Sequence, residues 1–390
     1  MHYTLDFVNK LMREETEKAV SVDYLSTKKL GYTKYSNARY VLFPRILNGV
    51  VYDETGIRIL ASETLSPNVQ NYHPSIVNQD VDYQRYEGTA ILLGNIPYAF
   101  GHSFTDGFKS LWFALTEDYR NLLRQGAKPV LFVPSSQCNS LPSYWKTFLR
   151  ALNINLEEVD IIAQNTLFDN IVIPDLCWGY DENGRIFFTE EYRQVCRMIA
   201  NAVDLANDNS IGTFDKVYLT RTRFSNWQRE VGESKLEKVF SKQGYKIVSP
   251  ETLSIEKQIQ ILRGAKMVAS TEGSISHAFI FCRPNTKVVI IRKTNWVNPY
   301  QLAINQAADL DVTFVDAHRT KVVQDEWQRM SGPFYLCITP EVEKFFGKRI
   351  PHCPLYLSLS YLWYRFRLSS WAQRKIMNRK IWHKIESVFC

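Results

Sequence analysis

The sequence predicts an α/β protein: two Rossmann-like domains that face a cleft, followed by a basic, aromatic helical tail. Short β-branched runs alternate with helix-like segments between Lys216 and Ala317, as in a parallel sheet. The same alternation recurs less regularly between residues 89 and 174. A chain of 390 residues is long enough for two domains, and its 45% hydrophobic content excludes an intrinsically disordered protein.

The second half has the most regular pattern. Five strands are expected, at residues 216–221, 245–249, 266–271, 287–293 and 312–317. Four helices are expected between them, at residues 233–244, 254–265, 274–281 and 298–309. A helix between each pair of strands is the connection that a parallel sheet requires, so both faces of this sheet should be covered.

The first half repeats this order with less regular spacing. Strands are expected at residues 89–94, 128–135, 159–164 and 170–174. Helices are expected from Gly101 to Gln125 and over 141–153, and an earlier hairpin around Asp53-Glu54-Thr55-Gly56. A helix at 189–206 leads into a polar run at 207–213, which is the expected domain boundary. The expected units are an acceptor-side domain (1–207), a nucleotide-binding domain (208–335), and a crossover with the tail (336–390).

Composition and the absence of common motifs limit the cellular compartment and the classes of enzyme that the sequence allows. The seven cysteines are scattered and include no CxxC pair, so neither a disulfide framework nor a zinc site is predicted. The segment MHYTLDFVNK carries charge where a signal peptide needs an apolar run, and no late uncharged stretch reaches the about 20 residues that span a bilayer. We therefore expect a cytoplasmic protein. Common P-loop, dinucleotide, nucleophile-elbow and zincin signatures are absent.

Three arginines follow the first strand of the second half. Arg221, Arg223 and Arg229 lie in the loop beyond the carboxyl end of this strand, where ligands of parallel sheets bind. Guanidinium groups could hold a diphosphate there through paired, charge-assisted hydrogen bonds. The alternative is that they are solvated loop cations.

A strand-turn-helix at 269–281 provides a second candidate anion site. Gly273 turns the chain and Ser274 begins the helix, so free N–H groups would point at an anion. Glu272 or His277 would then read the hydroxyl groups of a sugar or ribose. The alternative is an ordinary structural turn.

The segment 98–115 provides a candidate general base. At helical spacing, Phe104, Phe108 and Leu111 form one buried face, and His102 and Asp106 meet as i, i+4 neighbours on the opposite face. A carboxylate beside an imidazole suits proton abstraction near neutral pH, with Asp106 as the expected base and His102 as its partner or alternative. The alternative is a solvated helix face.

Taken together, these segments resemble glycosyltransferase family 61, which includes bacterial capsule and exopolysaccharide enzymes and eukaryotic xylosyl- and N-acetylglucosaminyltransferases. The pieces that carry the resemblance are GHSFTDGF, YLTRTRFSNWQREVGESKLEKVF and GYKIVSPETLSIEKQIQILRGAKMVASTEGSISHAFIFCRPNTKVVII. Arg221 and Arg229 match the family's arginines, Glu233 its acid at a helix start, and Gly273 its turn glycine. Gly232 stands where many members have Asn, and Glu272 where many eukaryotic members have His.

The resemblance implies a GT-B fold, inversion at the anomeric carbon, and no essential metal or other cofactor. The donor would be a nucleotide-sugar, with UDP as the expected nucleotide, held mainly by the second half. The acceptor would be a polysaccharide or lipid-linked glycan in surface polysaccharide biosynthesis. The expected reaction is therefore hexosyl or pentosyl transfer by a cytoplasmic enzyme.

Most of the net charge of +7 lies in the tail. Residues 355–390 hold seven cations and one anion, so the tail carries +6 and the body is nearly neutral. From Trp371 to Phe389 the pattern is that of an imperfect basic amphipathic helix, which suggests contact with the anionic inner face of the cell membrane. The expected contact residues are Arg365, Arg367, Trp371, Arg374, Lys375, Arg379, Lys380 and Trp382. The alternative is a crossover helix that packs on the first domain.

Two other function classes fit parts of the sequence. A sugar-binding or assembly protein of the same pathway would keep the fold without the chemistry. A nucleic-acid-binding protein would use the basic tail, but the nearly neutral body offers no second basic face, so nucleic acid is not an expected partner.

Overall fold

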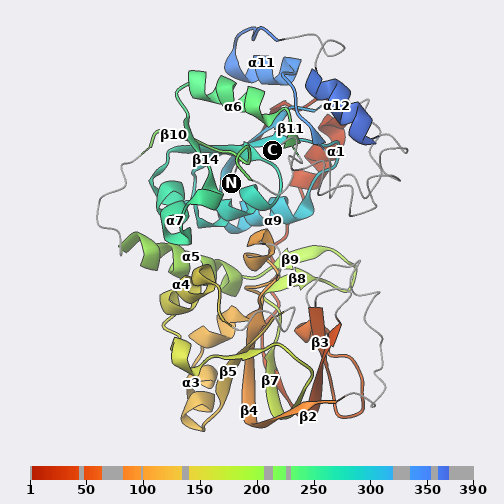
Figure 1. The fold of residues 1–390 in the computed structure, drawn as a ribbon, viewed down its shortest axis with the longest axis vertical. Helices are drawn as coiled ribbons and strands as arrows, with labels where there is room; N and C mark the ends of the chain where they lie inside the picture. The colour runs from red at the N-terminus through yellow and green to blue at the C-terminus, as the bar shows by residue number, and fades with distance from the viewer. Residues whose placement is uncertain are drawn as a thin grey trace.

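The computed structural model describes residues 2–43, 48–63, 82–97, 100–133, 140–205, 214–224, 230–318, 334–352 and 359–368. The chain forms two six-stranded sheets, one in each half, with helices packed around them (Figure 1). Two short two-stranded sheets complete the described strands. The prediction of an α/β protein with largely parallel sheets is confirmed.

The second-half sheet is parallel throughout and has the strand order β1-β15-β14-β13-β10-β12. Its strands are β1 (His2–Phe7), β10 (Lys216–Leu219), β12 (Lys246–Val248), β13 (Met267–Thr271), β14 (Lys287–Arg292) and β15 (Asp311–Asp316). Its helical connections are α6 (Glu233–Lys242), α7 (Ile255–Gly264), α8 (Ser274–His277) with η6 (Ala278–Phe281), and α9 (Pro299–Ala307). The five predicted strands and four predicted helices are confirmed, with η5 (Pro250–Thr252) before α7.

Both faces of this sheet are buried, because successive strand residues point to opposite sides. On one face, Tyr218 and Val289 belong to an apolar cluster with Phe240 of α6. On the other face, Val217 and Val288 join the main core with α7 and α9. This two-sided burial explains why the strands read as continuous apolar runs.

The first residues of the chain belong to the second half. Strand β1 pairs in parallel with β15, and α1 (Lys10–Val20) follows it. Buried Arg292 joins these segments: its guanidinium lies 3.1 Å from Asp316 and donates a hydrogen bond to Thr16. β1 and α1 were expected in the first domain, residues 1–207, but in the structure they pack with the second half.

The first-half sheet is mixed and has the strand order β3-β2-β7-β4-β5-β6. Its strands are β2 (Tyr32–Phe43), β3 (Asn48–Tyr52), β4 (Gln84–Asn95), β5 (Lys128–Phe132), β6 (Asp160–Ile162) and β7 (Thr166–Pro174). Strands β7, β4, β5 and β6 are parallel neighbours, whereas β2 runs antiparallel to β7 and β3. The expected turn at 53–56 is present, with a hydrogen bond from Gly56 N to Asp53 O. The remaining small elements are η1 (Leu60–Ser62), η4 (Leu156–Glu158), β8 (Trp178–Tyr180) and β9 (Ile186–Phe188).

The prediction of one helix from Gly101 to Gln125 is wrong. The segment forms η2 (Phe100–Ser103), turns, η3 (Leu111–Leu115) and then α3 (Glu117–Arg124). Its chain packs so closely that a Cβ on Gly107 would lie 2.6 Å from the Ser103 carbonyl oxygen and 2.9 Å from the Trp145 ring. Because both sides of the segment are buried, tertiary packing overrides the helical pattern.

The two halves share one apolar core. Helices α4 (Ser143–Ala151) and α5 (Glu190–Leu205) lie between the two large sheets, beside α7 (Figure 1). The Phe281 ring lies 5.2 Å from Phe104 and 6.1 Å from Phe148, centroid to centroid. An apolar contact of this kind fixes the segment that holds Phe104 against the second half.

The described part of the C-terminal segment packs on the second half. Strand β16 (Phe334–Tyr335) pairs with β11 (Glu230–Val231), α11 (Pro340–Phe346) lies against β1 and β15, and α12 (Leu359–Leu368) contacts β11 and β16. These contacts differ from a crossover that returns to the first half. Most of the expected tail, residues 369–390, and the expected boundary at 207–213 lie outside the described residues.

Candidate active site

His102 and Asp106 form a dyad in the segment that was expected to be helical. The Asp106 Oδ2 atom lies 2.5 Å from His102 Nδ1. The Asp106 side chain is 3% exposed, whereas His102 is 43% exposed. His102 can therefore reach a substrate, and Asp106 can act only from behind it.

The environment of the dyad adjusts the proton affinity of His102. Burial lowers the pKa of the imidazole, but the hydrogen bond and the charge of Asp106 outweigh this effect, so the pKa is raised overall. The carboxylate also fixes the ring orientation and leaves Nε2 as the outer nitrogen. His102 is therefore better placed than Asp106 to act as a general base.

A buried lysine lies behind the dyad. The Lys109 ammonium is fully buried, and it makes no hydrogen bond to another described residue. Burial lowers its pKa to about 8, against the opposing attraction of Asp106 and Glu63. At helical spacing Lys109 falls on the same face as His102 and Asp106, but the sequence pattern did not predict its burial.

The Tyr300 ring of α9 lies beside the dyad on the side of the second half. The Tyr300 ring lies 6.3 Å from the rings of both His102 and His277, and its hydroxyl lies 2.9 Å from that of Tyr180. Burial lowers the pKa of His277 to about 3, helped by the charge of His102. His277 therefore stays neutral and buried at the contact between the two halves.

Gly101 joins the dyad segment to the second half. A Cβ at Gly101 would lie 2.4 Å from the Ser274 Cβ and 2.8 Å from its Cα. Segment η2 therefore packs directly on α8, which begins at Ser274. This contact places the dyad beside the strand-turn-helix that was predicted as an anion site.

The donor-side candidates lie at the carboxyl ends of adjacent strands. Strands β14, β13 and β10 are neighbours, and Lys293, Gly273 and Arg221 follow them within two residues. Gly273 has φ +126°, and a Cβ there would lie 3.2 Å from Lys293 Nζ. Glycine at this turn therefore allows the Lys293 ammonium to approach the backbone.

Glu230 links two of these cations. Its Oε1 atom lies 2.8 Å from Lys293 Nζ and 3.5 Å from the Arg221 guanidinium. The sequence reasoning missed both Lys293 and Glu230. The position of Lys293, as the last residue of a predicted strand, was the signal that could have identified it.

Two further buried carboxyl groups have raised pKa values. Burial and the nearby charge of Glu230 raise the pKa of Glu233 to about 7, although the Arg221 backbone N–H donates to it. Burial likewise raises the pKa of Glu272 to about 7, against the attraction of Arg292 and Lys293. Both carboxyl groups therefore titrate near neutral pH beside the candidate anion site.

The other predicted site residues have different surroundings. Arg223 is exposed, Ser274 is half-buried at the start of α8, and Arg229 lies outside the described residues. Of the predicted membrane contacts, Arg365 is exposed on α12, and Arg367 lies in the last turn of the same helix. The other six membrane-contact residues lie outside the described residues.

The described residues lack two features. There, no group of three or more His, Cys, Asp or Glu side chains is arranged to hold a metal ion. Among these same residues, no helix combines the length and hydropathy needed to cross a membrane.

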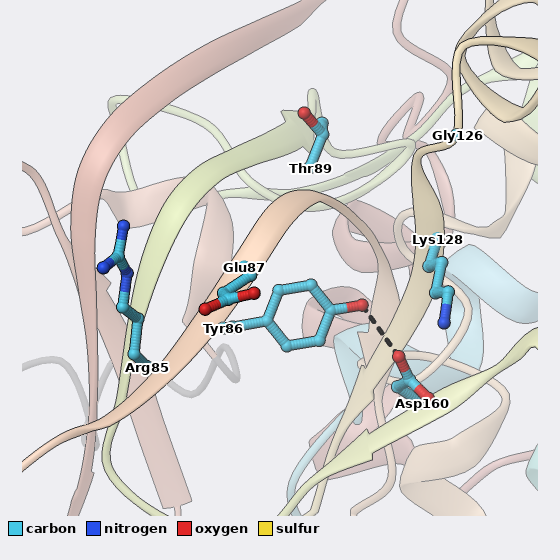
Figure 2. Close-up of a pocket in the computed structure, with 7 residues that line it drawn as sticks. All are labelled: Arg85, Tyr86, Glu87, Thr89, Gly126, Lys128 and Asp160. Carbon is cyan, nitrogen blue, oxygen red and sulfur yellow. Dashed lines mark hydrogen bonds between the residues drawn. The ribbon is translucent and has the colours of Figure 1, made fainter.

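A small hollow lies at the amino ends of strands β4, β5 and β6 in the first-half sheet. Figure 2 shows its lining, in which Tyr86 donates a hydrogen bond to Asp160 and Lys128 lies nearby. The hollow is at the first residues of β5 and β6, which are the amino ends of these parallel strands. Ligands of such sheets bind at the carboxyl ends, so we do not assign this hollow to the active site.

Comparison with known proteins bears on the segments just described. Residues 100–289 match the family model described as Glycosyltransferase 61. The match begins beside the dyad, includes Arg221, Glu230 and Gly273, and ends in β14. No curated protein matches the chain. Residues 100–289, about half of the chain, therefore form a glycosyltransferase family 61 domain, and the protein is a glycosyltransferase.

Proposed function

We propose that this enzyme transfers a hexose or pentose from a nucleotide-sugar, with UDP as the nucleotide, to a polysaccharide or lipid-linked glycan in surface polysaccharide biosynthesis. Transfer inverts the anomeric carbon, requires no metal, and uses a GT-B arrangement of the two halves. The observation that carries this proposal is the contact of Gly101 with Ser274. The His102–Asp106 dyad thus lies beside Ser274, which follows Gly273 at the end of β13, and Arg221 follows the neighbouring strand β10.

The geometry suggests how the two halves share the reaction. His102 Nε2 takes the proton of an acceptor hydroxyl while the acceptor oxygen attacks the anomeric carbon of the donor. The bond between this carbon and the diphosphate breaks, and the diphosphate leaves with the electron pair. Arg221, whose guanidinium lies 3.5 Å from Glu230, would stabilise the negative charge that develops on the leaving diphosphate.

Asp106 acts as a positioning residue in this scheme. Its buried carboxylate holds His102 Nδ1 and stabilises the imidazolium that forms on proton transfer. The expectation from the sequence, with Asp106 as the base, would require substrate access to a side chain that is 3% exposed.

Hydrolysis of nucleotide-sugars tests the proposed chemistry. We expect the full chain to hydrolyse one class slowly from a panel of UDP-, GDP- and CMP-sugars, at the same rate in EDTA and in Mg²⁺. Nucleotide release measured by chromatography gives the rate, and NMR of the anomeric proton gives the stereochemistry of the product of transfer. Binding without turnover would favour the sugar-binding or assembly protein, and loss of activity in EDTA would contradict metal independence.

The dyad predicts an acid limb in the pH dependence of transfer. His102 must be neutral to accept a proton, and its pKa is raised from the ordinary value of 6.5, so kcat/KM should fall as pH drops through a value above 6.5. The same raised pKa stabilises the fold fully below pH 6.5, and this stabilisation is lost as pH rises through the folded-state value. Asp106→Asn should move the acid limb to lower pH, because burial alone lowers the pKa of His102. An unmoved limb would assign the titration to another group.

We also propose peripheral contact with an anionic membrane on its cytoplasmic side. Helix α12 buries Tyr364 against β11 and β16, but its outer face exposes Leu359, Leu362 and Phe366 by 82%, 54% and 43%. Arg365 is exposed on the same helix, and residues 355–390 carry +6. An apolar stripe beside cations fits the surface of an anionic bilayer, where a lipid-linked acceptor would be found.

Liposome binding tests this surface. We expect the full chain to sediment with vesicles of phosphatidylglycerol and phosphatidylcholine and not with phosphatidylcholine alone. Leu362→Glu should weaken sedimentation about fivefold or more, because it places a charge in the apolar stripe. Leu60→Glu is the matched control, since Leu60 is 55% exposed on η1 of the first half. Equal binding to both vesicle types would contradict the proposal.

A further inference from the structure

Three adjacent strand ends form a charged cluster that the proposed mechanism uses only in part. Arg221 follows β10, Gly273 follows β13, and Lys293 follows β14, and these strands are neighbours in the sheet. Arg221 and Lys293 both contact Glu230, which lies on β11. The cluster therefore has two cations and one carboxylate at the edge where ligands of parallel sheets bind.

Lys293 is held in a restricted position. Its side chain is 9% exposed, and its ammonium lies 4.2 Å from the centroid of the Phe334 ring. Because a Cβ at Gly273 would lie only 3.2 Å from Nζ, a larger residue at this turn would press on the ammonium. A lysine buried this far needs an anionic partner, because desolvation of an unpaired charge is costly.

Glu230 supplies that partner within the protein. Its side chain is 4% exposed, and its Oε1 atom lies 2.8 Å from Lys293 Nζ and 3.5 Å from Arg221. The same oxygen thus faces both cations, which is the position that an oxygen of a bound diphosphate would take. A diphosphate carries more charge and more acceptor oxygens than a carboxylate, so it can compete for the same donors.

Two nearby carboxyl groups carry only part of their negative charge at neutral pH. Burial raises the pKa of Glu233 and of Glu272 to about 7, so each carboxyl group is partly protonated there. Arg292 faces Glu272 from the end of β14, but it is already paired with Asp316 at 3.1 Å. Lys293 and Arg221 are therefore the cations that can respond to an incoming anion.

We propose that Lys293 is a ligand of the donor's diphosphate, and that Glu230 holds its ammonium until a nucleoside diphosphate displaces the carboxylate. The inference rests on the proposed function, because it assumes a nucleotide-sugar donor at these strand ends. It adds Lys293, which was not predicted from the sequence, to the residues that bind the donor. It also makes Glu230 a competitor of the diphosphate for the Lys293 ammonium. Glu230 then keeps the buried ammonium neutralised when no donor is present.

Calorimetric titration of the full chain with UDP, GDP and CDP tests the exchange. For the diphosphate that the unmodified protein binds best, Lys293→Gln should weaken binding about tenfold or more, because a charged contact is lost. Glu230→Gln should tighten binding about three- to tenfold, because the competing carboxylate is gone. In the double variant, this gain from Glu230→Gln should disappear, since the cation that it frees is absent.

Matched controls keep the result interpretable. Lys287→Gln removes an exposed lysine from the start of the same strand, and Glu251→Gln removes an exposed carboxylate from η5; neither should change affinity more than about twofold. Thermal denaturation establishes that each variant is folded, and Lys293→Arg, which keeps the charge, should retain part of the affinity if Lys293→Gln misfolds.

The possible failures are distinguishable. Unchanged binding in folded Lys293→Gln overturns the inference and leaves the proposed function intact. Weaker binding in Glu230→Gln would make Glu230 a support for the cations, which also overturns the exchange. If the unmodified protein binds none of the three diphosphates, the proposed donor class and the inference both fall.

Discussion

Replacing His102 with alanine is expected to lower the rate of sugar transfer by about 10²- to 10⁴-fold, because positioned general bases contribute this much. Nucleoside diphosphate binding should change little, since the donor-side cations lie on the second half. Steady-state transfer assays and calorimetry on the same preparation measure the two effects. Near-normal turnover in folded His102→Ala would remove this residue from the role of base.

The Asp106→Asn variant is expected to lose transfer by a similar factor, although its side chain does not reach a substrate. An asparagine cannot stabilise the imidazolium, and its amide can favour the wrong tautomer of His102. The pair His2 and Asp311 is a matched control: His2 Nδ1 lies 3.3 Å from Asp311 Oδ1 at an exposed site. His2→Ala and Asp311→Asn should therefore leave transfer unchanged, and a similar loss in these variants would indicate a general structural effect.

A methyl group at Gly101 is expected to have the second large effect. The added Cβ would lie 2.4 Å from the Ser274 Cβ and 2.8 Å from its Cα, and backbone cannot move aside as a flexible side chain can. Gly101→Ala should lower the free energy of unfolding by about 1–3 kcal/mol through overpacking. It should also lower kcat by about 10²-fold, because the dyad would shift relative to the donor side.

The control for this prediction is Gly31→Ala. A Cβ at Gly31 would meet only Asp175 Oδ2 at 3.7 Å, which is ordinary contact, so stability and turnover should be nearly unchanged. Denaturant unfolding gives the free energy, and transfer assays below the transition give kcat. Normal kcat in a destabilised Gly101→Ala protein would show that the contact supports the fold without aligning the reaction.

The sequence alone predicted most of the second half. The alternation of apolar runs with helical segments between residues 216 and 317 is local information, because parallel strands buried on both faces must be apolar throughout. It also placed Arg221 and Gly273 at strand ends, which the structure brings to one edge of the sheet. Strand β1 was missed because its partner, β15, lies about 300 residues away, and no local pattern records such a pairing.

The first half was harder to predict. The predicted burial of Phe104 and Phe108 is confirmed, but the predicted helix is wrong. A repeat of apolar residues does not reveal that the opposite face of the segment is also covered. Burial of Asp106 and Lys109 against neighbouring segments excludes the alternative of a solvated helix face. Their spacing predicted the His102–Asp106 contact, although the local structure differs from the predicted helix.

The sequence by itself determined the α/β class, the family resemblance and the residue types available for chemistry, because these follow from local patterns. Tertiary structure alone decided which residue of the dyad is exposed, that Gly101 meets Ser274, and that Lys293 shares Glu230 with Arg221. These facts depend on segments that are distant in the chain. Their burial and charge pairing arise only when the two halves pack together, which no single stretch of sequence can specify.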